Sequence, residues 1–194
     1  RTDSNGYFFY NSIEAESGDK ISVTGGINSV TGNEAKMTYF TMDDNEVAST
    51  MTTLVVATQE AGTEISYQEA QEIVTHALGI PQTVHIGSFD SNEAGNGDDD
   101  LIAVQVTAQM STTITGFTAV VSAGGESVSV EDASDAMIES FAAAAMASPL
   151  NGEIDFSDRA TVTGIMTEAN DYLTNGSALE TSVTVDFSYT AEAI

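Results

Sequence analysis

The feature that most constrains the fold of this chain is its charge. Thirty aspartates and glutamates face only four lysines and arginines, which gives a formal net charge of -26. Self-repulsion at this charge destabilises a compact structure unless salt or divalent cations screen it. We therefore expect a saline or cation-rich setting and an extracellular or surface-exposed location. The competing interpretation is an acidic protein that needs no special ions.

The charge balance also restricts the partners. Nucleic-acid binding needs clustered lysines and arginines that replace condensed counter-ions, and the four cations Arg1, Lys20, Lys36 and Arg159 are scattered. Anionic membrane surfaces are excluded by the same reasoning. No apolar run approaches the roughly 18 residues of a membrane span, so we expect no membrane insertion. A start at Arg1 without methionine indicates a processed or trimmed chain.

The composition favours β-strands. Threonine, serine, valine and alanine are abundant and only two prolines occur, which is typical of extended strands joined by glycine and asparagine turns. Strands are predicted at 83–89, at 101–110, within 152–166 and at 179–190. The last of these shows a clear alternation, which would place on one face of the strand Leu179, Thr181, Val183, Val185, Phe187 and Tyr189.

Two segments carry helix signals instead. Each is opened by a serine N-cap with an acid three residues later, Ser66 with Glu69 and Ser129 with Asp132, and Gly79 terminates the first helix. The apolar stripes of the two helices consist of Ala70, Ile73, Val74, Ala77 and Leu78 in the first and of Ala133, Ala136, Met137, Ser140 and Phe141 in the second.

The two helices also belong to a candidate internal repeat. A shift of 63 residues, from 54 to 117, aligns Leu54 with Phe117 and Val74 with Met137, and it superposes the two serine caps. Chance similarity between two capped helices is the alternative. We interpret each copy as a strand, a helix and two strands. The predicted fold class is therefore α+β, a mainly antiparallel β-sheet with two amphipathic helices.

The expected organisation has three parts, within one compact domain or as separate small ones. Residues 1–48 form a β-rich N-terminal segment, 49–111 the first module and 112–194 the second. The N-terminal segment contains four consecutive aromatic residues, Tyr7, Phe8, Phe9 and Tyr10. They either cover the core of their own domain or belong to an arm that adds a strand to the sheet of a neighbouring subunit.

An acidic stretch between Phe89 and Leu101 is the candidate metal site. It begins like an EF-hand loop, but Leu101 stands where the bidentate glutamate belongs. Its oxygens could still chelate a divalent ion, and the cofactor would then be Ca²⁺, held by Asp90, Asn92, Asp98 and Asp100. The alternatives are weak diffuse cation binding and a solvated hairpin loop.

No catalytic residue is predicted. The absence of cysteine excludes disulfides and thiolate chemistry, and neither His76 nor His85 has the partners that a metal site or an acid–base pair requires. An unrecognised hydrolase is therefore the disfavoured interpretation. Asn175 opens an Asn-Gly-Ser triplet in a predicted turn, which would be a glycosylation acceptor on a secretory route.

Two classes of function fit these observations. The first is a non-enzymatic structural protein, a subunit of a filament, surface layer, shell or capsid, whose partners are copies of itself. Association would use sheet edges and acidic faces screened by cations. The second is a calcium-dependent binding module on a cell surface, with the loop at 90–100 as its site.

Overall fold

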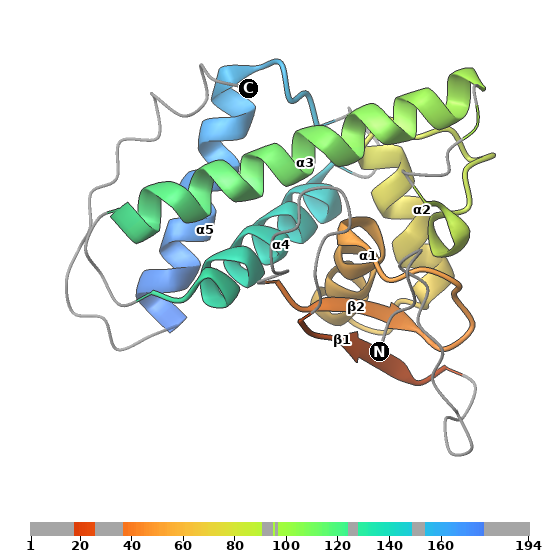
Figure 1. Cartoon of the computed structure of the whole chain (residues 1–194), viewed down its shortest axis with the longest axis horizontal. Coiled ribbons are helices and arrows are strands. Elements are labelled where there is room, and N and C mark those ends of the chain that lie inside the picture. The colour runs from red at the N-terminus through yellow and green to blue at the C-terminus, as the bar shows by residue number, and fades with distance from the viewer. Residues whose placement is uncertain are drawn as a thin grey trace.

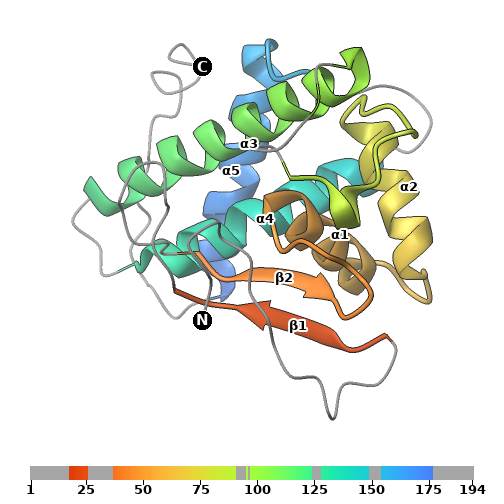
Figure 2. The same ribbon diagram turned by 45° about the vertical axis from the view of Figure 1, so that its right-hand side comes forward.

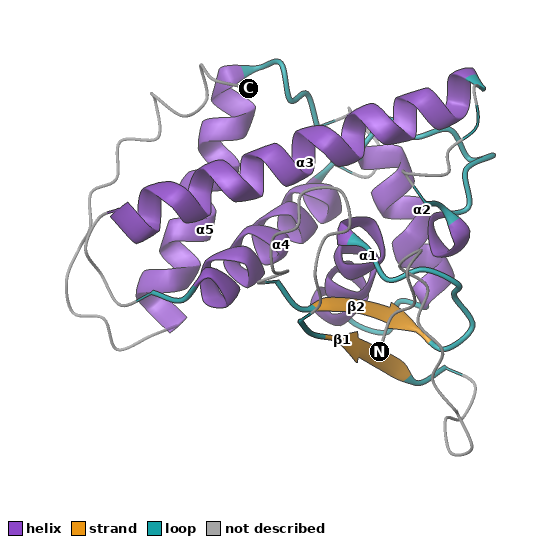
Figure 3. Cartoon of the chain, viewed as in Figure 1, coloured by secondary structure: helices purple, strands orange, loops and turns teal. Residues whose placement is uncertain are grey.

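The computed structural model describes residues 18–25, 37–90, 95, 97–123, 128–148 and 154–176. These residues form a helical body with a small sheet on one side (Figure 1, Figure 3). The elements follow one another in the order β1 (Lys20–Val23), β2 (Tyr39–Met42), α1 (Thr50–Ala61), α2 (Tyr67–Ala77), a 3₁₀ helix η1 (Ile86–Ser88), α3 (Asp98–Ala123), α4 (Val130–Ala147) and α5 (Arg159–Gly176).

The prediction of a mainly antiparallel β-sheet with tandem strand–helix–strand–strand modules is wrong. The segment at 101–110 lies in α3, residues 160–166 lie in α5, and 83–89 contains turns and η1. Within the N-terminal segment, which is predicted to be β-rich, the described strands are β1 and β2, and they pair antiparallel. The strand predicted at 179–190 lies outside the described residues.

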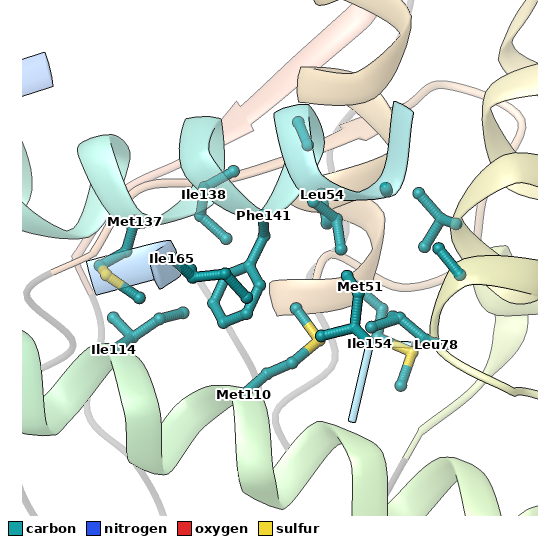
Figure 4. Packing of buried hydrophobic residues seen from close by; sticks show 14 of the residues in the cluster. Met51, Leu54, Leu78, Met110, Ile114, Met137, Ile138, Phe141, Ile154 and Ile165 are labelled. Atoms are coloured by element: carbon teal, nitrogen blue, oxygen red, sulfur yellow. The ribbon is translucent and has the colours of Figure 1, made fainter. Parts of the chain in front are cut away.

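Helix α4 is the centre of the body, since it packs against each of the other four helices. Its side chains Met137, Ile138 and Phe141 are fully or almost fully buried. Figure 4 shows them between Met110 and Ile114 of α3 and residues of α1 and α5. Burying a side chain of this size stabilises the fold by about 1.5–3 kcal/mol. The hydrophobic core is therefore formed between helices rather than on a sheet.

Both helices predicted from serine caps are confirmed. Ser66 and Glu69 form a reciprocal capping box at the start of α2, and the Ser129 hydroxyl accepts from the Asp132 N–H at the start of α4. Gly79 follows the end of α2 with a φ of 64°, which a glycine adopts without strain. The predicted stripes are the buried faces of these helices, with Ile73 partly buried.

Helix α3 shows a helical period in its burial. Its buried apolar side chains recur at spacings of three or four residues, and they are Ala103, Val106, Met110, Ile114, Phe117 and Val121. Asp98, Asp99 and Asp100 occupy the first turn, where carboxylates interact favourably with the helix dipole. The sequence-based prediction of an acidic loop followed by a strand at 101–110 misses the helix start that the three aspartates indicate.

Threonine accounts for much of the error in fold class. The hydroxyls of Thr107, Thr112 and Thr113 each donate at 2.8 Å to the carbonyl oxygen four residues earlier in α3. A β-branched, polar side chain is thereby accommodated inside a helix. No buried side-chain nitrogen or oxygen among the described residues lacks a hydrogen-bond partner. High threonine content is therefore compatible with this helical core.

The two copies of the proposed repeat have the same local structure, although it is not the predicted one. Each described part runs from a helix through a connection into a serine-capped helix, α1 to α2 and the end of α3 to α4. The aligned pairs Leu54 with Phe117 and Val74 with Met137 are all fully buried. The duplication and the boundaries at 48 and 111 stay predictions.

Candidate functional site

The sheet has one covered edge and one edge that the described part of the chain leaves open. At β2, the Phe40 N–H donates to Thr53 Oγ1 of α1 at 2.9 Å, so a helix side chain satisfies this outward N–H. β1 lies on the far side of β2 from the helices (Figure 1, Figure 2). Among the described residues no third strand pairs with β1.

The register shows which backbone groups of β1 face outward. Ser22 is opposite Phe40, whose N–H points to α1 and not to β1. In an antiparallel ladder opposite residues exchange both hydrogen bonds or neither, so the N–H and C=O of Ser22 point away from β2. The open edge of β1 therefore presents a donor and an acceptor in the geometry that an added strand requires.

Lys20 does not block this edge in the usual way. Its ammonium group contacts Glu60 Oε1 of α1 at 2.5 Å and lies 5.0 Å from the centre of the Phe40 ring. A lysine on an edge strand commonly prevents further pairing by extending into solvent. Here the side chain turns back over the sheet, so the edge keeps its backbone groups and the ion pair holds β1 against α1.

The turn after β2 fixes the sheet to the body. Asn45 Nδ2 donates to Tyr67 Oη of α2 at 2.8 Å and to Thr41 Oγ1 at 3.0 Å. The backbone N–H groups of Glu46 and Val47 donate to the Gly87 carbonyl. A β-carbon at Gly87 would lie 2.0 Å from Asn45 Oδ1, so only glycine allows this approach. The position of the sheet edge is set by these contacts.

The acidic loop is only partly described. Asp98 and Asp100 lie in the first turn of α3, Asp90 is the first residue of the loop, and Asn92 lies outside the described residues. Asp100 Oδ2 accepts from the Gly95 N–H at 3.1 Å, and the Thr83 hydroxyl donates to Asp99 Oδ2 at 2.5 Å. In the described ranges no three histidines or carboxylates are grouped to hold a metal ion. The calcium site stays a prediction.

The other predicted residues are dispersed. His76 and His85 are both exposed, and Val84 and Ile86 on either side of His85 are buried. Asn175 lies in the last turn of α5 and not in the predicted turn between strands, while its glycosylation stays a prediction. Tyr7, Phe8, Phe9 and Tyr10 lie outside the described residues.

Sequence reasoning missed a row of carboxylates on α4. Glu131, Asp135 and Glu139 follow one another at intervals of four residues, with Asp132 beside them. Burial is the main cause that raises the pKa of Asp135 to about 6, and the charges of Glu131, Glu139 and Asp132 raise it further. Like charges at this spacing destabilise a helix. Their spacing is visible in the sequence.

Asp135 has the pKa of a proton donor but not the surroundings of a catalytic one. A shallow, widely open surface region lies along α5, lined by residues that include Asp158, Thr163 and Asp171. Asp135 does not line it. A general acid needs a substrate position within hydrogen-bond reach, so the raised pKa of Asp135 is better explained by half-burial in an acidic row.

A second missed feature is the solvent face of α3. From Leu101 to Gly125 the chain contains no Asp, Glu, Lys, Arg or His, its longest run without an ionisable residue. Leu101 and Ile102 are 52% and 40% exposed, and both belong to this run. Among the described residues no helix is apolar enough over a sufficient length to cross a membrane. The uncharged run would have revealed this face.

Comparison of the chain with protein-family models, with curated proteins and with solved structures finds no match.

Proposed function

We propose that this chain is a non-enzymatic structural protein, a self-assembling subunit of a filament, surface layer, shell or capsid outside the cell. The observation that carries the proposal is the edge of β1 with which no strand of the described residues pairs. A third strand from a neighbouring subunit would extend the ladder at this edge. The added strand would pair with the outward groups of Ser22.

The acidic surface sets the condition for assembly. With a net charge of -26, two copies repel each other strongly at low ionic strength. The Debye length falls from about 10 Å at 0.1 M salt to about 3 Å at 1 M, so concentrated salt or bound divalent cations permit close approach. Association should therefore need salt and reverse on dilution.

The test is negative-stain microscopy and light scattering of the purified chain in low salt, in high salt, and with calcium, magnesium or a chelator. Ordered polymers in high salt support the proposal. A particle that stays monomeric throughout contradicts it, and a monomer whose melting temperature rises with calcium alone supports a calcium-dependent binding module instead.

A variant of the edge separates strand addition from other modes. Ser22→Pro removes the outward N–H and leaves the β1–β2 ladder, because that N–H does not point to β2. Ser22→Ala is the matched control, since it keeps the N–H. We expect Ser22→Pro to abolish polymers and Ser22→Ala to retain them, with similar melting temperatures. Equal assembly of both variants would exclude the β1 edge as the contact.

A further inference from the structure

We infer that the solvent face of α3 is a second contact, at which two copies of the chain pair through antiparallel α3 helices. The inference rests on the proposed self-assembly and names a surface for it. The face, called the α3 face below, is the exposed line along the helix formed by Leu101, Gln105, Ala108, Thr112, Thr115, Ala119 and Ser122.

Charge distinguishes the α3 face from the other helices. Each of the other four exposes at least one carboxylate to solvent: α1 has Glu60, α2 has Glu72, α4 has Glu139 and α5 has Glu168. The α3 face has none beyond the first turn. For a chain of charge -26, it is the surface, among the helices in the described part of the chain, on which a second copy meets no opposing carboxylate beyond the first turn.

The position of α3 makes this face accessible to another molecule. α3 packs on α4 through its buried stripe and lies across the front of the helical body (Figure 1, Figure 2). A helix of 26 residues is about 39 Å long. Two of the three large hydrophobic side chains that are exposed among the described residues, Leu101 and Ile102, belong to its first turns. A contact along the α3 face would cover Leu101.

The size of the facing side chains and the charge of the first turn both favour an antiparallel arrangement of the two α3 helices. In a parallel pair, the Asp98–Asp100 triplets of the two copies would lie side by side, and Leu101 would oppose Leu101. In an antiparallel pair with its two-fold axis near Thr112, the triplets lie at opposite ends. Leu101 of one copy then meets the small Ser122 of the other, so large side chains face small ones. This is an isologous two-fold contact.

The expected affinity is low. A strip of helix about 39 Å long and about 10 Å wide offers a few hundred Å² per copy, below the roughly 800 Å² per partner of a standard interface. The pair should therefore form at high protein concentration and high salt, as a contact that acts together with the strand edge.

The chain provides a matched pair of variants for the test. Thr112 and Thr167 are both exposed helical threonines whose hydroxyls donate at 2.8 Å to the carbonyl four residues earlier. Thr112→Glu adds a charge at the centre of the α3 face, and Thr167→Glu adds the same charge on α5. Ser22→Pro is the background for both, because it removes strand addition and leaves α3 pairing to be measured alone.

Sedimentation velocity in high salt gives the dissociation constant of the dimer. We expect Thr112→Glu to raise the dissociation constant of the dimer at least about tenfold and Thr167→Glu to leave it unchanged. Equal dimerisation of the two variants, or no dimer in the Ser22→Pro background, overturns the inference. Polymers of the unsubstituted chain would then still support the proposed function. A dimer without polymers of the unsubstituted chain would support the α3 pair and contradict the proposed function.

Cross-linking tests the direction of the pair, and the absence of native cysteine keeps the test specific. In the antiparallel arrangement Ala108 of one copy lies opposite Thr115 of the other. Oxidation of mixed Ala108→Cys and Thr115→Cys chains, distinguished by a mass tag, should give the mixed disulfide. Disulfides between like chains only would indicate a parallel pair and overturn the antiparallel arrangement.

Discussion

Helices α3 and α4 pack against each other, yet their outer surfaces differ in charge. α4 carries Glu131, Asp132, Asp135 and Glu139, whereas α3 carries no ionisable residue after Asp100. α4 is also the central helix of the core, and α3 lies on the outside of it. The comparison shows that the charge of -26 is not spread evenly. Four of the carboxylates lie on α4, whose other side is anchored in the core, and none lies on the α3 face beyond its first turn.

The largest expected effect on stability tests whether α4 forms the core and the α3 face lies on the surface. Phe141 of α4 is fully buried and packs on Phe156, with ring centroids 5.9 Å apart. Phe141→Ala should lower the free energy of unfolding by about 3–5 kcal/mol, because it removes a large core side chain and leaves a cavity. Leu101→Ala on the α3 face should change it by less than about 0.5 kcal/mol. Denaturant unfolding measures both, and equal losses would contradict the assignment of core and surface.

The second effect concerns the acidic row on α4. The pKa of Asp135 is raised in the folded state, so the folded chain binds this proton more tightly than the unfolded chain. The resulting stability is lost above about pH 6 and grows as the pH falls from there to about 4. The lowered pKa values of Glu69, Asp155 and Asp158 have the opposite sign, and their stabilisation is lost at lower pH.

Asp135→Asn should therefore stabilise the fold at pH 7. The full shift would correspond to about 3 kcal/mol, and screening at this half-exposed site reduces it to on the order of 1 kcal/mol. The variant should also show a smaller gain in stability between pH 7 and pH 5. Thermal melts at the two pH values measure both effects. A variant that is no more stable than the original chain at pH 7 would disprove the destabilising role of the row.

A smaller effect on stability is expected from removing either of two hydroxyl groups, one buried and one exposed. Ser140 of α4 is buried and donates to the Ile165 carbonyl of α5 at 2.7 Å, whereas Thr115 of α3 is exposed and donates to the Ser111 carbonyl. Ser140→Ala should cost about 1 kcal/mol, since it removes a buried hydrogen bond between helices. Thr115→Ala should be neutral within about 0.5 kcal/mol. Urea titrations of both variants decide this, and the reverse order would contradict the packing of α4 on α5.

The sequence allowed prediction of the helices whose signals are local and strong. α2 and α4 combine a serine cap with a clear division between apolar and polar faces. α1 lacks this division, because it is buried on nearly all sides from Thr50 to Val56. α3 lacks it because threonine, alanine and glutamine on its outer face contrast weakly with its buried residues. Periodicity then gives no clear decision between helix and strand.

The candidate surfaces were predictable to different degrees. The open edge of β1 depends on the covering of β2 by Thr53, a contact between residues far apart in the chain that no local pattern contains. The α3 face, in contrast, could have been found from its uncharged run of residues. Its significance depends on knowing that the run is a helix with one side buried.

The most direct test of self-assembly is the average mass of the unsubstituted chain as a function of ionic strength, measured by sedimentation velocity at fixed protein concentration. Sodium, magnesium and calcium salts are compared between about 0.1 M and 1 M ionic strength, where the Debye length falls from about 10 Å to about 3 Å. We predict that the mass rises with ionic strength for all three cations and falls again on dilution. A mass that stays that of one chain in every salt would contradict self-assembly through screened contacts.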